Sequence, residues 1–195
     1  IIFLDSDDIM LPHCLEQRIR VFKEFKDFDF HVFQVERIDE NGSGIGYWNI
    51  DNQRDHLQRF LTIDSVWHTS GPIWKRESLI MYDQFFDVGL KVWQDLDYHV
   101  QAILKRMKYR LHFNRPHDIL YREHDEASIS QGAYSVEQRY SQIHFIKKTY
   151  PIVKQESRTQ LVYLEKRIVK KVIQTRNLLL LLNLIWWRLK RKIKY

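Results

Sequence analysis

Residues Ile1–Pro12 read IIFLDSDDIMLP, four apolar residues that run directly into an acidic turn. Such a run is typical of a strand buried on both faces of a parallel sheet. Because a buried strand needs neighbours on both sides, we expect Ile1–Leu4 to lie in the middle of a fold whose earlier part precedes this chain. The acidic turn would then lie at the carboxyl end of the strand, where open α/β sheets bind ligands.

The rest of the chain is predicted to alternate between strands and helices, and this alternation favours an α/β domain. Apolar residues at helical spacing identify the clearest helix, 93–107, in which Leu96, Val100 and Ile103 share one face. The other predicted helices are 15–25, 55–61, 77–81 and a nearly continuous stretch from Ser135 onward that breaks at Pro151. The predicted strands are 28–38, 109–113 and 118–122, with a turn at 40–44.

Composition places the chain among globular proteins. Hydrophobic residues make up 44% of its 195 residues, enough to build a core and to exclude global disorder. The single cysteine, Cys14, excludes an internal disulfide framework and favours a reducing, cytoplasmic setting.

The net charge of +6 is unevenly distributed. Residues 158–195 hold 11 basic residues and one acid, whereas residues 1–157 hold 20 basic and 24 acidic residues. Residues 1–157, the body of the protein, are therefore slightly acidic. They show no stripe of basic residues on a recognisable nucleic-acid-binding domain, so nucleic-acid binding by the body is disfavoured.

Asp5, Asp7 and Asp8 place three carboxylates within four residues. Carboxylates this close repel one another unless a cation or a proton offsets their charge. Hard oxygen ligands suit Mg²⁺ or Mn²⁺, which can bridge diphosphate oxygens. The alternative is a solvated turn in which one Asp caps the next helix.

Two further stretches carry candidate chemistry. Asp95 lies in the first turn of the predicted helix 93–107, where the helix dipole favours an ionised carboxylate that can act as a general base. Asp is also common in first turns for stability alone. His124 follows the strand 118–122, although a lone histidine is more often structural than a metal ligand.

Four pieces in order resemble family 2 glycosyltransferases with the GT-A fold: FLDSDDIMLP (3–12), HTSGPIWKRESL (68–79), FFDVGLKVWQDLDYHVQAIL (85–104) and LYREHDEASIS (120–130). The resemblance covers residues 1–130. It implies a Rossmann-like, mostly parallel sheet flanked by helices, with the nucleotide-binding half missing before Ile1. Residues 131–195 would form a helical extension with a basic end.

The resemblance also implies roles for individual residues. Asp5-Ser6-Asp7 matches the DXD motif, in which the first Asp approaches the ribose and the last holds a divalent metal, Mn²⁺ or Mg²⁺. Asp8 follows as a common extra acid, and Ser70-Gly71 matches a loop near the donor sugar. Asp95 matches the catalytic base of the "ED" motif, with Gln94 in place of its first acid. His124 matches a histidine that completes the metal shell.

The function implied is an inverting transfer of a sugar from a nucleotide-diphosphate sugar to an acceptor hydroxyl, in bacterial cell-surface polysaccharide or lipid-linked glycan synthesis. Trp74 and Trp93 are candidates for an acceptor-side stacking surface, with ordinary core aromatics as the alternative. A non-catalytic, membrane-associated remnant without a nucleotide pocket is the competing interpretation. A metal-dependent phosphodiesterase fits less well, because it needs more His and Asp ligands on converging strand ends.

Residues 178–189 are apolar apart from Asn183 and Arg188. A helix over this stretch is about 18 Å long at 1.5 Å per residue, too short for a ~30 Å hydrocarbon core. Trp186-Trp187 beside a basic cluster favours an interfacial helix, 178–195, on an anionic membrane. The expected location is the cytoplasm, peripheral at the inner face of the plasma membrane. The alternative is a helix packed on the domain with a solvated basic end.

Overall fold

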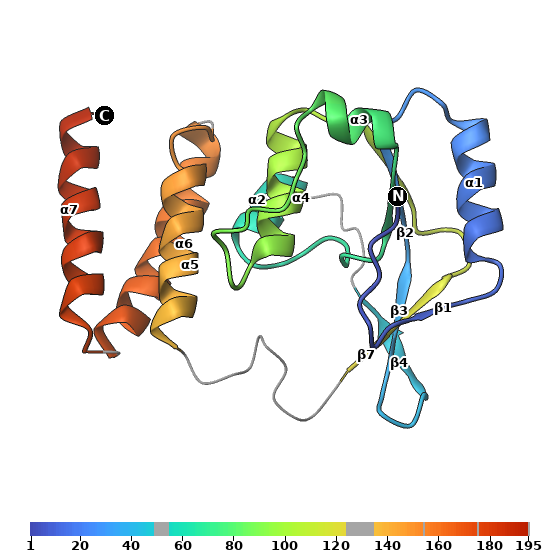
Figure 1. The fold of residues 1–195 in the computed structure, drawn as a ribbon, viewed down its shortest axis with the longest axis horizontal. Coiled ribbons are helices and arrows are strands. Elements are labelled where there is room, and N and C mark those ends of the chain that lie inside the picture. Colours follow the sequence, from blue (N-terminus) through green and yellow to red (C-terminus); the bar gives the residue numbers. More distant parts are fainter. Residues whose placement is uncertain (49–54, 124–134, 154, 175, 195) are drawn as a thin grey trace.

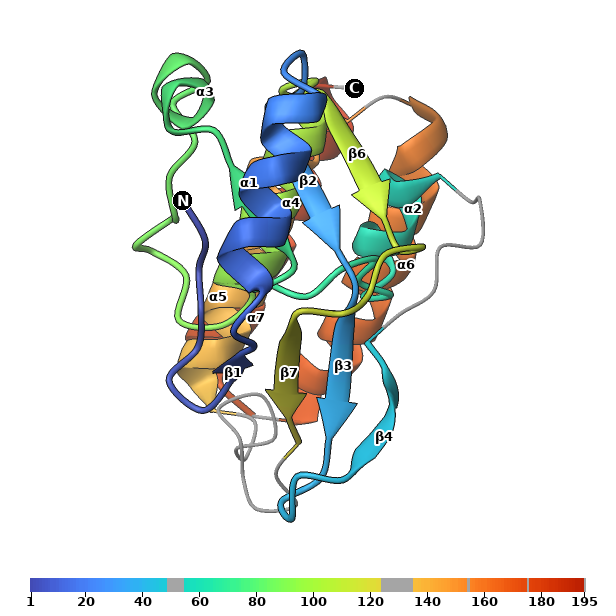
Figure 2. The same cartoon turned by 90° about the vertical axis from the view of Figure 1, so that its right-hand side faces the viewer.

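The computed structural model describes residues 1–48, 55–123, 135–153, 155–174 and 176–194. The described part contains two small mixed sheets and seven helices. Viewed as in Figure 1, the helices α5, α6 and α7 form one end, the strands lie toward the other end, and α2 and α4 lie between them. Helix α1 covers the opposite side of the strands (Figures 1 and 2).

The strands of the two sheets are interleaved along the chain. In the first, β2 (Phe30–Phe33) pairs antiparallel with β5 (Pro72–Trp74) and parallel with β6 (Tyr109–His112). In the second, β3 (Val35–Ile38) pairs parallel with β7 (Ile119–Arg122) and antiparallel with β4 (Gly44–Tyr47), and β1 (Ile9–Met10) pairs antiparallel with the far side of β7. Each sheet thus has one parallel pair among its pairings, and the expected mostly parallel sheet is not what the described chain forms.

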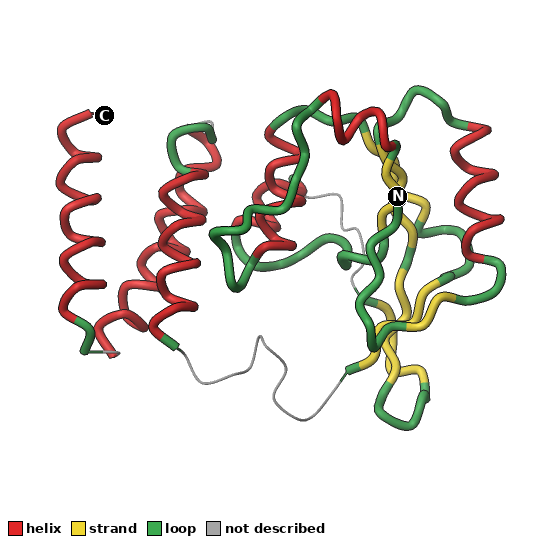
Figure 3. The backbone as a smooth tube through the Cα atoms, in the orientation of Figure 1, coloured by secondary structure: helices red, strands yellow, loops and turns green. Residues whose placement is uncertain are grey.

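The helices match the predicted pattern closely. They are α1 (Cys14–Glu24), α2 (His56–Leu61), α3 (Arg76–Met81), α4 (Gln94–Leu104), α5 (Val136–Thr149), α6 (Gln155–Gln174) and α7 (Leu178–Lys194). Local caps explain two starts, since Asp55 accepts a hydrogen bond from the Gln58 backbone N–H at α2 and Ser135 does so from Gln138 at α5. Figure 3 shows how these helices gather around and beyond the strands.

The prediction for Ile1–Leu4 is wrong in this structure. The segment makes a single antiparallel bridge, Ile2 with Ile73, and Ile1 and Leu4 are exposed. The backbone of Ile1 exchanges two 2.8 Å hydrogen bonds with that of Trp74, so the segment runs along the outer edge of β5. A strand with a neighbour on one side only leaves much of its apolar surface uncovered. The predicted strand 28–38 is also interrupted, at Gln34, where the chain passes from the first sheet to the second.

One hydrophobic cluster runs through most of the molecule. It contains Phe30 and Trp74 from the first sheet, Val100 from α4, and Leu161 and Leu180 from α6 and α7. The helices after residue 135 therefore pack on the body through a shared core. No helix of the described chain is long and apolar enough to cross a membrane.

Candidate active site

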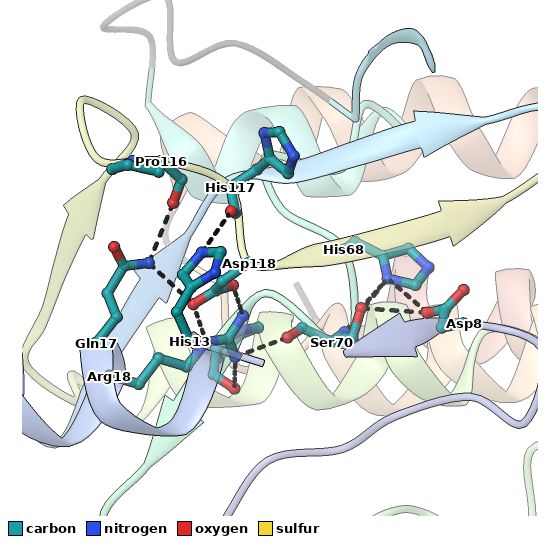
Figure 4. Close-up of polar contacts among 10 residues, drawn as sticks. Asp8, His13, Gln17, Arg18, His68, Ser70, Pro116, His117 and Asp118 are labelled. Carbon is teal, nitrogen blue, oxygen red and sulfur yellow. Dashed lines mark hydrogen bonds and ion pairs between the residues drawn. The ribbon is translucent and has the colours of Figure 1, made fainter. Parts of the chain in front are cut away.

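The acidic turn lies beside the loop that carries the glycine motif. Asp8 precedes β1 and is buried, with its side-chain oxygen Oδ2 accepting a 3.3 Å hydrogen bond from Ser70 Oγ. Ser70 is buried just before β5, and its hydroxyl oxygen lies 2.7 Å from His68 Nδ1. Figure 4 shows His68, Ser70 and Asp8 pointing toward one another from these two segments.

Three side chains are arranged so that they could hold a metal ion. One potential ligand atom from each of Asp5, Asp8 and His68 lies within 4.8 Å of the other two. Asp8 Oδ1 is buried and has no hydrogen-bond partner within the described ranges. A buried carboxylate oxygen without a partner carries a desolvation cost that a bound cation would offset. The residues present therefore fit a divalent cation.

The electrostatics of the turn support this fit. Burial, with the charge of Asp5 added, raises the pKa of Asp8 to about 6, while the backbone of Arg122 and the hydroxyl of Ser70 oppose the shift. Burial, and then the charges of Asp7 and Asp95, raises the pKa of Asp5. Burial lowers the pKa of His68 to about 4, so its ring is neutral at pH 7 and able to act as a ligand.

Asp95 belongs to the same acidic cluster. It lies in the first turn of α4, as the sequence predicts, and its charge is near enough to Asp5 to affect that group's pKa. The residue before this helix start, Trp93, has φ of 66°, a left-handed conformation that is uncommon for a bulky side chain.

The structure thus brings together Asp5, Asp7, Asp8, Ser70 and Asp95 from distant parts of the sequence. The neighbouring Gly71 is buried beside them, and a Cβ on it would lie 3.1 Å from the carbonyl oxygen of Phe33 and 3.2 Å from that of His68. A side chain would be tight there, which explains the need for glycine.

The two candidate acceptor-side aromatic residues differ in exposure, since Trp74 is buried and Trp93 is partly exposed. Trp74 is 1% exposed and stacks on Phe30 at 4.0 Å between ring centroids. Trp93 is half-buried and packs edge-on against Phe145 of α5. Both placements agree with the alternative of core aromatics. His124, the predicted metal ligand, lies outside the described residues.

Sequence reasoning missed His68. The signal was available, because this histidine stands two residues before Ser70 within the HTSGPIWKRESL stretch. Its ring lies between two aromatic neighbours, Trp48 at 4.7 Å and Tyr121 at 4.6 Å between centroids. These contacts fix its position beside Asp8.

A separate hollow lies away from the acidic cluster, at the ends of β6 and α1. Its lining includes Phe25, Arg110 and His112. Arg110 stacks over the Phe25 ring at 4.0 Å, and Arg115 nearby forms an ion pair with Glu24. These groups are therefore engaged with one another, and we assign no chemistry to the hollow.

Comparison with known proteins gives a structural match. The structure of S. aureus TarS, residues 1–349, in complex with UDP-GlcNAc is similar to this chain, with a TM-score of 0.52 and 14% sequence identity. The match covers 87% of this chain and 56% of the TarS chain. The chain has a glycosyltransferase-like fold. No protein-family model matches the sequence, and no curated protein matches it.

At 14% identity the similarity to TarS concerns the fold alone. The chain spans about half the length of the TarS chain that it matches.

Proposed function

We propose that this chain carries the catalytic part of an inverting glycosyltransferase, similar to family 2 enzymes, that moves a sugar from a nucleotide-diphosphate sugar to an acceptor hydroxyl. The observation that carries the proposal is the clustering of Asp5, Asp8 and His68, with Asp95 near enough for its charge to raise the pKa of Asp5. The similarity to a structure that binds UDP-GlcNAc, a nucleotide sugar, supports a donor of that class.

The donor side is assigned to the acidic turn and the glycine loop. Asp5, Asp7 and Asp8, with Ser70 and Gly71, would surround the diphosphate and sugar of the donor. Asp5, Asp8 and His68 have the geometry to hold Mn²⁺ or Mg²⁺, and the family resemblance adds Asp7 and His124 as ligands. When bound, a divalent ion supplies positive charge that stabilises the departing diphosphate.

Asp95 is proposed as the general base. Its carboxylate would accept the proton of the acceptor hydroxyl while the hydroxyl oxygen bonds to the anomeric carbon. The bond from that carbon to the diphosphate oxygen breaks on the opposite face, and the bonding electrons leave with the nucleotide diphosphate. Attack opposite the leaving group inverts the anomeric configuration. Asp95 lies in the first turn of α4, and a general base must be within hydrogen-bond reach of the hydroxyl proton that it accepts.

The acceptor would be a bacterial cell-surface polysaccharide or a lipid-linked glycan at the cytoplasmic face of the plasma membrane. Support comes from α7, which exposes an apolar surface of Leu178, Leu182, Ile185, Trp186 and Leu189 in the most basic part of the chain.

The test is turnover of nucleotide-sugar donors by the whole protein, including any residues that precede Ile1. Asp95→Asn should lower the rate by about 10²–10⁴-fold, the usual cost of removing a positioned base. Donor and Mn²⁺ binding, measured by calorimetry, should change little because Asn keeps the size and polarity of the side chain. Asp27→Asn, at an exposed position of the body, is the matched control.

Wild-type activity in Asp95→Asn would contradict the assignment of the base. A folded wild-type protein that transfers no sugar from any donor would instead favour the non-catalytic, membrane-associated remnant.

A further inference from the structure

Arg18 and Asp118 form a fully buried ion pair behind the acidic cluster. Arg18 Nη2 donates to Asp118 Oδ1 at 2.6 Å and Nε donates to Oδ2 at 2.8 Å, a two-point contact between α1 and the residue before β7. Both side chains are 0% exposed. Because burying two charges costs several kcal/mol per ion, such a pair adds little net stability over an apolar pair of similar size. The pair therefore calls for an explanation other than stability.

The third guanidinium nitrogen of Arg18, Nη1, contacts the Ser70-Gly71 loop. It donates to the carbonyl oxygen of Ser70 at 2.9 Å and lies 3.5 Å from that of Pro72. Figure 4 shows the guanidinium between Asp118 on one side and Ser70 on the other. A planar group with donors in fixed directions can hold both partners at once, whereas a lysine ammonium offers no such fork.

Asp118 fixes the segment after the acidic turn. Its carbonyl oxygen accepts a 3.0 Å hydrogen bond from the backbone N–H of Leu11, three residues after Asp8. Its Oδ2 also accepts a 3.1 Å hydrogen bond from Gln17 Nε2. The ion pair thus connects the two segments that carry Asp8 and Ser70.

The Ser70 side chain contacts two of the proposed metal ligands. Its hydroxyl donates to Asp8 Oδ2 at 3.3 Å and lies 2.7 Å from His68 Nδ1. The loop is also held by Gly71, whose carbonyl oxygen accepts from the Phe33 N–H at 3.0 Å. The carbonyl of Ser70 is therefore fixed by Arg18, and its side chain fixes Asp8 and His68.

We propose that the Arg18–Asp118 pair is a positioning device that sets the spacing of Asp8 and His68 for a divalent cation. This inference rests on the proposed function, since it concerns the same acidic site. Groups that orient the ligands of a metal typically change its affinity 10–100-fold when they are removed. Arg18 and Asp118 make no contact with the cation in this scheme and act through Ser70.

The test separates positioning from stability by replacing both charges together. The paired variant Arg18→Met/Asp118→Leu leaves no unpaired buried charge, so its resistance to urea should equal or exceed that of the wild type. Its dissociation constant for Mn²⁺, measured on the whole protein from the EPR signal of free Mn²⁺, should rise about tenfold or more. The control is Glu16→Leu/Arg20→Met, which removes an exposed pair from the same helix and should leave Mn²⁺ affinity unchanged.

Equal Mn²⁺ affinity in a folded paired variant would overturn the inference while leaving the metal site in place. A wild-type protein that binds no Mn²⁺ would overturn the metal part of the proposed function itself. Should the paired variant not fold, Arg18→Lys answers the question, because it keeps the positive charge and loses the fork. We then expect weaker Mn²⁺ binding with unchanged circular dichroism, and unchanged binding would contradict the proposal.

Discussion

Asp8 is a buried carboxylate whose burial costs stability and indicates a functional site. Its Oδ1 oxygen has no partner within the described chain, and its pKa is raised to about 6 because burial disfavours the charge. Strong desolvation next to other carboxylates is the pattern expected of a functional site rather than of a solvated turn. Asp8 is therefore buried rather than solvated, whereas Asp5 and Asp7 of the same turn are exposed.

His99 of α4 is a second buried polar group. Among the described residues neither of its ring nitrogens has a hydrogen-bond partner, and the ring lies among Phe60, Trp67, Trp74 and Tyr98. Burial, with a smaller contribution from the charge of His68, lowers the pKa of His99 from its ordinary value to about 3. The folded protein therefore keeps His99 neutral at a pH at which the unfolded chain protonates it.

This difference predicts an acid-sensitive stability. Between pH 6.5 and pH 3 the unfolded state binds one more proton at His99 than the folded state does. The free energy of unfolding is therefore unaffected by His99 above pH 6.5 and decreases as the pH falls below it. From pH 7 to pH 5 the loss is about 2 kcal/mol for this residue. In His99→Phe, urea unfolding at each pH should show a shallower fall. The wild-type and variant curves should run parallel between pH 7 and pH 8, and equal slopes below pH 6.5 would contradict the prediction.

For single residues, the sequence predicted candidate site residues where these are close together along the chain. Asp5, Asp7 and Asp8 stand out as a motif, and Asp95 stands out by its place at a helix start. His68 did not, because its relation to Asp8 spans 60 residues and depends on how the loop before β5 folds back. Arg18 and Asp118, 100 residues apart, have no sequence pattern that pairs them.

Among the elements, helices were predicted better than strands because their apolar spacing is a local property. In α4, Leu96 and Val100 of the predicted face are buried and Ile103 is partly buried, and burial also extends to the other sides of the helix, at Tyr98 and Ala102. The Ile1–Leu4 run was misjudged because an apolar run does not specify whether neighbours flank it. β4 was not predicted, since Gly44 and Gly46 lower strand propensity and the strand forms only as the partner of β3.

Helix α7 has features of both interpretations of residues 178–195, a helix packed on the domain and an interfacial helix on a membrane. Leu180 and Leu184 are buried against the neighbouring helices, and Arg188 forms an ion pair with Glu165 of α6. The other side exposes Leu182, Ile185 and Trp186, each more than half exposed. The helix is therefore packed on the molecule and also offers an apolar surface beside basic residues.

If α7 binds an anionic bilayer, charges on its exposed side should abolish binding. The variant Leu182→Glu/Ile185→Glu removes two inserted aliphatic side chains, each worth about 1.5–3 kcal/mol on full burial. We expect its co-sedimentation with phosphatidylglycerol-containing vesicles to fall at least about tenfold, with unchanged helicity.

The control is Met81→Glu/Val88→Glu, which alters two highly exposed apolar residues of the body and should not affect vesicle binding. Vesicle binding that persists in the α7 variant would exclude this surface as the contact.

At the scale of the whole molecule, the body and the helical extension are joined by charge as well as by the shared core. Lys148 of α5 donates to Asp97 Oδ2 of α4 at 2.7 Å and to Asp87 Oδ2 at 2.9 Å. The Asp97 side chain is 1% exposed, so loss of Lys148 would leave a buried carboxylate without its cation. The same helix α4 carries Asp95, two residues earlier.

Lys148→Met should therefore lower the free energy of unfolding by about 2–4 kcal/mol, the range for breaking a buried pair reduced for the partial exposure of the lysine. Urea denaturation at pH 7 measures this change. The paired variant Lys148→Met/Asp97→Leu should recover most of the loss, because it removes the unpaired charge. Lys147→Met, one residue earlier on α5, should cost less than about 1 kcal/mol. Equal effects at the two lysines would contradict a special role for Lys148.

The overall arrangement was predictable as an α/β body followed by helices, and the match to TarS supports that class. The division into two mixed sheets was not, because strand order and direction depend on pairings between residues such as Phe33 and His112, 79 positions apart. No local pattern encodes those pairings.

The single cysteine offers a kinetic consequence of this architecture. Cys14 at the start of α1 is 0% exposed, packs with Val35 and Ile119, and has its pKa raised to about 11, chiefly by burial. A thiol so placed reacts with an alkylating or disulfide reagent only when α1 opens away from the second sheet. The labelling rate of the unmodified protein therefore reports the opening equilibrium of α1, and a ligand held at the acidic turn would slow that rate without any engineered probe.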